Sequence, residues 1–171
     1  MTISRRLLLP LLLVALHACT NLPSDPSASV EFDHNYDFSQ VRRIAIQPIA
    51  RDTLATMLIS DQQISRINGA LSNELTRRGF EVVMENADAD IFLTWRFINS
   101  NSNLSPFDPG NGEIPQGTLY VNMIDPVVLQ SKWRATFQSD LRDQPETPEA
   151  AQYRREAAKA ILARFPPGAE S

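Results

Sequence analysis

The only cysteine of this 171-residue chain, Cys19, directly follows an apolar run near the N-terminus, and this arrangement most constrains what the chain can fold into. No internal disulfide can stabilise a domain, and no thiol elsewhere can bind a metal or act as a nucleophile. Arg5 and Arg6 precede the run Leu7–Leu16, which contains no charged residue. Such a run is too short to cross a hydrocarbon core of ~30 Å as a helix but fits the apolar region of a signal peptide. The folded domain is therefore expected to be built from the residues after Cys19.

The residues around Cys19 resemble the lipobox of bacterial lipoproteins. Leu16 is the apolar residue three positions before the cysteine and Ala18 is the small residue directly before it, while His17 is an unusual occupant of the middle position. The resemblance implies cleavage after Ala18 and attachment of a diacylglycerol to the Cys19 sulfur. At ~0.8 kcal/mol per buried CH₂, two or three acyl chains anchor a protein almost permanently.

The same resemblance implies an address in the cell envelope. Asp directly after the cysteine usually retains such lipoproteins at the inner membrane, and Thr20 stands there instead. We therefore expect the periplasmic face of the outer membrane. Two alternatives stay open: an ordinary secretory signal with an incidental cysteine, and export by the twin-arginine route, which Arg5 and Arg6 would suit.

The composition and the net charge of the chain indicate which classes of partner to expect. The chain is 43% hydrophobic and has a formal net charge of -4, which becomes more negative once Arg5 and Arg6 leave with the leader. The remaining basic residues are scattered or paired, so nucleic acid is not expected as a partner. The sequence predicts a signal peptide over 1–18, a lipidated flexible tether over 19–29, a single domain over 30–167 and a tail over 168–171.

Apolar periodicity predicts an α+β domain with the order β-α-β-β-β-β-α. Helices are expected between Ser60 and Gly79 and between Thr147 and Pro166, because both ends of each carry capping or helix-ending residues. Strands are expected over Val41–Ile49, Phe80–Met84, Ile91–Asn99, Gly117–Ile124 and Lys132–Ser139. Two such helices would cover one face of a mostly antiparallel sheet in a two-layer sandwich.

In their order and spacing, several short segments resemble the bacterial lipoproteins of domain-of-unknown-function family 4136. These segments are Asp33 with Tyr36–Gln40, Arg43–Ile46, Leu75 with Arg78–Phe80, Ala89–Ile91, Gly117–Leu119, Ile124–Asp125, Trp133–Ala135, Ile161–Leu162 and Phe165–Pro167. The resemblance implies a fold and an envelope address but no catalytic residues. The chain departs from the family in the hairpin after Asp125, where the family's Thr-Gly-Lys turn is replaced by Val128-Leu129-Gln130.

Two regions are candidates for binding. If helices cover one face of the sheet, strand alternation places Arg96, Asn122 and Arg134 on the open face, where the arginines could simply be solvated or could bind an anion. The polar segment Asn99–Gln116 is expected either to be a loop without function or to bind through its apolar residues Phe107 and Ile114. Trp95 and Trp133 are expected in the core instead.

No motif predicts catalysis, a metal or a cofactor. His34, between Asp33 and Asp37, is the only histidine after the leader, and the simpler interpretation of these residues is a polar turn. Asp88 and Asp90 are expected to shape a turn. We therefore expect a lipid-anchored, non-catalytic binding or assembly module, with an envelope protein as the candidate partner. The alternatives are an envelope hydrolase using carboxylates or a metal near His34, and a structural surface protein.

Overall fold

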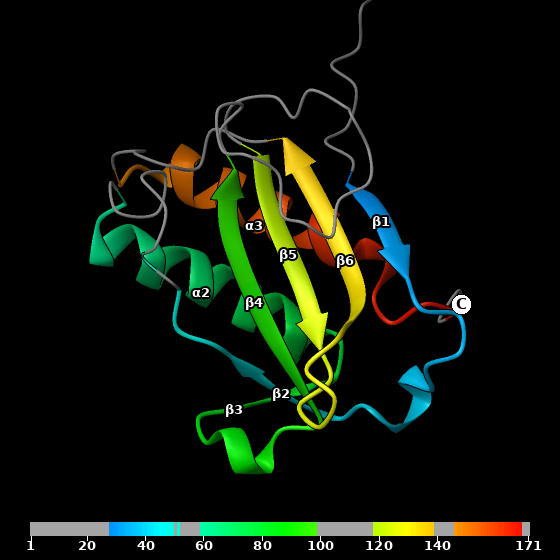
Figure 1. The fold of residues 1–171 in the computed structure, drawn as a ribbon. Coiled ribbons are helices and arrows are strands. Elements are labelled where there is room, and N and C mark those ends of the chain that lie inside the picture. Colours follow the sequence, from blue (N-terminus) through cyan, green and yellow to red (C-terminus); the bar gives the residue numbers. More distant parts are fainter. Residues whose placement is uncertain (1–27, 50, 52–58, 99–117, 139–145, 169–171) are drawn as a thin grey trace, which may run out of the picture.

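The computed structural model describes residues 28–49, 51, 59–98, 118–138 and 146–168, and these form a two-layer α+β sandwich (Figure 1). One layer is a sheet, and helices α2 (Asp61–Arg77) and α3 (Pro148–Ile161) pack together against one of its faces. The strands are β1 (Ser29–Phe32), β2 (Arg43–Ile46), β3 (Glu81–Val83), β4 (Ile91–Ile98), β5 (Thr118–Ile124) and β6 (Ser131–Gln138). The predicted fold class is confirmed.

The strands lie in the order β1-β6-β5-β4-β2-β3. β4, β5 and β6 form an antiparallel meander, and β1 adds to its edge, antiparallel to β6. β2 is parallel to β3, because α2 carries the chain from β2 back to the same end of the sheet, and β2 is also parallel to β4 on its other side. The sheet is therefore mixed, with a large antiparallel half and a short parallel end.

β1 was missing from the predicted order, so the observed order begins with an additional strand. The strand ends at Phe32, directly before the residues around His34 that were expected to form a polar turn. β1 is four residues long and pairs on one side only. Four residues are too few to show a clear alternation of apolar and polar side chains. The extended conformation of β1 depends instead on its backbone pairing with β6.

Helix α2 begins and ends where its capping residues predict, and α3 begins where Thr147 predicts. The end of α3 differs from the prediction, because the α-helix stops at Ile161 and a 3-10 helix, Leu162–Arg164, occupies the residues before Pro166. Ser60 Oγ accepts a hydrogen bond from the Gln63 N–H at the start of α2, and Thr147 Oγ1 accepts one from the Ala150 N–H at the start of α3. Gly79 follows the C-cap residue Arg78 of α2, and its φ of 90° is in the left-handed region that glycine adopts without strain. The Phe80 N–H then bonds to the Leu75 carbonyl, which closes the last turn of α2.

The core lies between the helices and the inner face of the sheet. Alternate residues of β4, β5 and β6 face inward, including both Trp95 and Trp133, which are buried as predicted. Trp95 Nε1 donates to Asn68 Oδ1 at 2.7 Å, and Trp133 Nε1 donates to the Arg164 carbonyl at 3.2 Å. Each indole therefore buries its ring and still satisfies its N–H.

The turn between β5 and β6 is held by Asp125. Its carboxylate accepts hydrogen bonds from the Val127 and Val128 N–H groups, and its carbonyl accepts one from the Leu129 N–H. Leu129 has a φ of 54°, a left-handed conformation that suits glycine better. It stands where the resemblance implies a turn glycine, and its side chain is 71% exposed. Asp125 therefore holds a turn that the local sequence does not favour.

Candidate functional site

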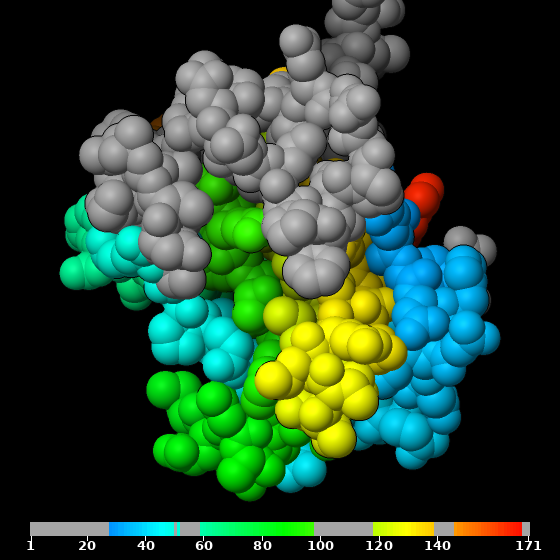
Figure 2. Space-filling view, viewed as in Figure 1, coloured from blue at the N-terminus to red at the C-terminus, as the bar shows by residue number. Residues whose placement is uncertain are grey.

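The strand register brings Arg96, Asn122 and Arg134 to one face of the sheet, opposite the helices. Asn122 of β5 pairs with Thr94 of β4 and with Arg134 of β6. Along each strand these are among the alternate residues that face away from the core. We call this side the outer face; Figure 2, viewed from it, shows atoms of β4 in green and of β5 and β6 in yellow at the surface. Phe107 and Ile114, the other predicted binding residues, lie outside the described residues, as does Cys19.

Tyr120 organises the centre of this face. It lies on β5 opposite Arg96 of β4 and Thr136 of β6. The guanidinium carbon of Arg96 is 5.0 Å from the centroid of the Tyr120 ring, and that of Arg134 is 5.2 Å away. Both distances are within the range of a cation–π interaction. We call Arg96, Tyr120 and Arg134 the Arg–Tyr–Arg cluster.

Sequence reasoning missed Tyr120, although the signal was present. Asn122 was predicted to lie on the open face, so Tyr120, two residues earlier in the same strand, had to face the same way. An outward tyrosine between two strands that each carry an outward arginine is the pattern of a stacked cluster. Tyr120 is nevertheless only 5% exposed, so it does not lie open on the surface.

The cluster has one acidic neighbour among the described residues. Glu31 of β1 pairs with Arg134 in the ladder, and its Oε2 lies 3.5 Å from Arg134 Nη1. That distance is at the outer limit of a hydrogen bond, and the Glu31 side chain is 75% exposed. Such an exposed ion pair contributes little and is screened by salt. Glu31 is therefore a weak partner for Arg134.

The arginine side chains also have hydrogen-bonding capacity that the described residues leave unused. The Nε atoms of Arg96 and Arg134 are buried and have no acceptor there. Asn122 Oδ1 accepts from Ser131 Oγ at 3.3 Å, a contact that uses neither N–H of the amide. The face therefore combines positive charge with N–H donors, which is the chemistry of anion recognition.

The residues around His34 form a polar turn with structural partners. Asp33 accepts hydrogen bonds from the Asn35 N–H and from Lys132 Nζ, and these lower the pKa of its carboxyl group. Asp37 accepts from the hydroxyl and the N–H of Ser39, and these bonds lower its pKa too. His34 packs against Phe32 with ring centroids 4.3 Å apart. In the described ranges no group of three or more His, Cys, Asp or Glu residues is close enough to hold a metal.

Asp90 has a structural environment as well. Burial raises the pKa of its carboxyl group, but hydrogen bonds from the Arg43 and Arg42 N–H groups and from the Arg43 side chain lower it by more. The net pKa lies below the usual value of 3.8. Asp90 therefore joins the start of β4 to the start of β2, as a turn-shaping residue does. Asp88 is exposed in the short 3-10 helix Asn86–Asp88.

Two shallow hollows lie on either side of the C-terminal segment. Their volumes are about 470 and 280 Å³, and both are bounded by Arg78, Pro166, Pro167 and Gly168. Arg78 is fixed there by Glu74 and by the Ala163 and Phe165 carbonyls. Phe165 itself fills the space beneath, with its ring centroid 5.3 Å from those of Phe80 and Trp133. Phe165 thus docks this C-terminal segment onto the core.

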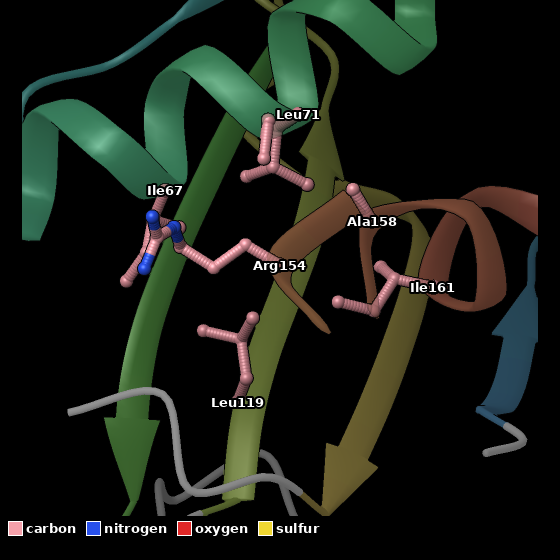
Figure 3. A pocket seen from close by; sticks show the side chains of 7 residues that line it. Ile67, Leu71, Leu119, Arg154, Ala158 and Ile161 are labelled. Atoms are coloured by element: carbon pink, nitrogen blue, oxygen red, sulfur yellow. The ribbon is translucent and has the colours of Figure 1, made fainter. Parts of the chain in front are cut away.

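A small cavity lies between the helices and the sheet. Its volume is about 10 Å³, roughly the space of one water molecule (Figure 3). Arg154 of α3 reaches into it between Ile67 and Leu119, and is only 5% exposed. Its Nη2 bonds to Glu146 Oε2 at 2.6 Å, and Arg66 Nε approaches the same oxygen at 2.7 Å. The cavity is too small for a ligand, so this ion-pair group belongs to the packing.

No helix in the described ranges is both long enough and apolar enough to cross a membrane.

The comparisons with known proteins agree with the fold. A family model described as a domain of unknown function, DUF4136, matches residues 28–167. A DUF4136 family protein from Bacteroides thetaiotaomicron has a similar structure, with a TM-score of 0.56, 12% identity, and coverage of 82% of this chain and 94% of its own. No curated protein sequence matches.

Two further kinds of solved structure are similar. A PDZ domain protein from Parabacteroides distasonis has a TM-score of 0.54 and 15% identity over 82% of this chain, which spans only 35% of that longer protein. A PelC dodecamer from Paraburkholderia phytofirmans has a TM-score of 0.50 and 13% identity over 80% of this chain and 94% of its own. At these identities the similarity concerns the fold alone.

Proposed function

The chain belongs to the DUF4136 family, and on that premise we propose that it is an exported lipoprotein whose single domain is a non-catalytic binding module of the cell envelope. The observation that carries the proposal is the asymmetry of the sandwich. Helices α2 and α3 cover one face of the sheet, whereas the outer face presents the Arg–Tyr–Arg cluster with Asn122 beside it. A polar, positively charged sheet face is a surface for recognition.

The environment of the carboxylates supports the non-catalytic part of the proposal, because the candidates for a hydrolase mechanism have structural roles. Asp33, Asp37 and Asp90 each accept hydrogen bonds that hold a turn or a strand end together. A lowered pKa also keeps each one ionised near neutral pH, which does not suit a general acid. Structural roles account for all three.

The lipid anchor is supported by the lipobox-like residues that end at Cys19. Residues 20–28 join that cysteine to β1 and span at most about 30 Å when extended. β1 starts beside Thr136, at the end of the sheet away from the turn between β5 and β6. Anchoring through Cys19 would therefore keep the domain close to the membrane, with the β5–β6 turn at the end farther from the tether.

Lipid attachment and membrane location are tested together in the native host. The full-length protein is expressed with a clickable palmitate analogue, and a Cys19→Ser variant serves as the control. We expect label and membrane fractionation for the wild type, and loss of the label for the variant. An unlabelled wild-type protein, cleaved and recovered in the soluble fraction, would contradict the anchor.

The binding surface is tested by photo-crosslinking in cells. A photoreactive amino acid replaces Thr136 on the outer face or, as a matched control, Arg155 on the exposed side of α3. We expect a reproducible crosslinked species from position 136, lost when Arg96 and Arg134 are both replaced by Met. Equal crosslinking from position 155 would show that the outer face has no special role.

A second copy of this chain is the alternative partner that we test for the outer face, because the similar PelC structure is a dodecamer. Light scattering after size exclusion measures the mass of the purified protein directly. A defined oligomer, together with crosslinks between copies at position 136, would make the partner another copy of this chain. A monomer would direct the search to a different envelope component.

A further inference from the structure

The Arg–Tyr–Arg cluster places two positive charges close together on one face of a protein that is acidic overall. Both guanidinium carbons lie about 5 Å from the same ring centroid, so the ring is shared between them. The whole chain has a formal net charge of -4. Like charges at short range repel each other unless a counter-charge lies between them. The cluster is therefore a local positive site in an otherwise negative molecule.

The described residues neutralise this charge only in part. Glu31 supplies one carboxylate, held at 3.5 Å from Arg134 and largely in water. No other ion pair within the described ranges involves Arg134, and none there involves Arg96. The neighbouring cation Lys132 is already paired with Asp33 at 3.0 Å. Within the part of the chain that the structure describes, the positive charge of the cluster thus exceeds the negative charge paired with it.

Stacking on Tyr120 prepares the arginines for a ligand. An arginine over an aromatic ring keeps its planar fork of N–H groups fixed, so it loses less rotamer freedom when it binds. The buried Nε atoms of both arginines have no acceptor from the described residues, and the Asn122 amide N–H groups lie next to Arg134 in the ladder. The Arg134 side chain remains 23% exposed, so an ion can reach the cluster from solvent.

The charge and the donors together select the class of ligand. A carboxylate has one negative charge and two oxygens, which one arginine fork satisfies. A phosphate group has a charge of about -1.5 to -2 and at least three acceptor oxygens, so it can engage two forks and an amide at once. We infer that Arg96 and Arg134, stacked on Tyr120 and assisted by Asn122, bind a phosphate group. This inference names the ligand of the surface that the proposed function assigns to binding.

The test is a titration of the full-length protein, purified in a non-ionic detergent, with inorganic phosphate at constant ionic strength. Calorimetry measures affinity and stoichiometry, and sodium acetate is the comparison anion. We expect one saturable phosphate site and acetate binding at least tenfold weaker. Arg96→Met or Arg134→Met is expected to weaken phosphate binding at least tenfold, whereas Arg155→Met on the exposed side of α3 changes it less than twofold.

A second variant keeps the test informative if the arginine substitutions disturb folding. Glu31 is largely exposed and competes with phosphate for Arg134. Glu31→Gln is therefore expected to tighten phosphate binding two- to fivefold, a gain that misfolding cannot produce. Absence of a saturable phosphate site, binding unaffected by both arginine substitutions, or weaker binding by Glu31→Gln would each overturn the inference.

A vesicle experiment distinguishes the two possible sources of the phosphate group, a lipid headgroup and a soluble phosphate. The chain from Thr20 onward, which lacks both the apolar run Leu7–Leu16 and Cys19, is sedimented with phosphatidylcholine vesicles that contain or lack phosphatidic acid. Binding that requires phosphatidic acid and both arginines supports the inference and identifies a lipid headgroup; binding of free phosphate alone supports it with a soluble ligand. Failure of both, with the crosslink from position 136 retained, would remove the phosphate inference and leave the proposed binding face intact.

Discussion

The ion-pair group around Glu146 gives the sharpest prediction about stability. Glu146 Oε2 lies 2.6 Å from Arg154 Nη2 and 2.7 Å from Arg66 Nε, so one oxygen serves two cations. Glu146→Ala removes that acceptor from both. We expect the free energy of unfolding to fall by about 3 kcal/mol and the melting temperature by about 10 °C.

The magnitude follows from the burial of the partners. A hydrogen bond to a charged group contributes about 1.5–3 kcal/mol, and two such bonds are lost. The Glu146 side chain is 48% exposed, so water can replace part of what it provides and the lower end of the range applies to each bond. The Arg154 side chain is 5% exposed, and its cation would remain in the cavity between the helices without a counter-charge.

A double-mutant cycle separates this cause from a general loss of packing. Arg154→Met removes the buried charge but keeps an apolar stem against Ile67 and Leu119, and should cost about 1 kcal/mol or less. In that background Glu146→Ala should cost only about 1.5 kcal/mol, because just the Arg66 bond remains to be lost.

Urea unfolding of the Cys19→Ser chain, followed by circular dichroism, measures each free energy. Glu156→Ala, on the exposed side of α3, is the matched control and should change stability by less than about 0.5 kcal/mol. An equal cost of Glu146→Ala in both backgrounds, or a cost below about 1 kcal/mol in the wild type, would refute the buried ion-pair reasoning.

Three further predictions concern the turn, the strand junction and the core. Leu129→Gly should raise the unfolding free energy by about 0.5–1 kcal/mol in urea melts, because it relieves the positive φ, whereas Leu129→Ala should leave it nearly unchanged. The pKa of Asp90 is lower in the folded than in the unfolded chain, so its stabilising effect is complete above about pH 5 and is lost as the pH falls through the folded value. Asp90→Asn should therefore cost about 1–2 kcal/mol at pH 7 and progressively less below pH 4; a constant difference across a pH series would contradict this. Phe165→Ala should cost about 3–5 kcal/mol in the same melts, since the ring is buried between Phe38, Phe80 and Trp133; a loss below about 1 kcal/mol would show that the chain end is not docked as described.

The sequence by itself determined the elements whose signals are local. The i, i+3, i+7 spacing of apolar residues located helix α2, and Ser60, Gly79 and Thr147 located helix ends, because capping depends on a few adjacent residues. Strict alternation located β4, β5 and β6 and assigned their faces, including Arg96 and Arg134. These assignments needed no knowledge of which strand pairs with which.

Only the tertiary structure decided the features that depend on pairing between distant segments. β1 is a strand because its backbone pairs with that of β6. The parallel pairs of β2 with β3 and β4 form between segments that are separated along the chain by α2. The contact of Arg96 and Arg134 with one Tyr120 ring depends on the register of three strands, and the register follows from the packing of the whole inner face. Local residue order fixes which way a side chain faces, whereas its neighbours are fixed by long-range packing.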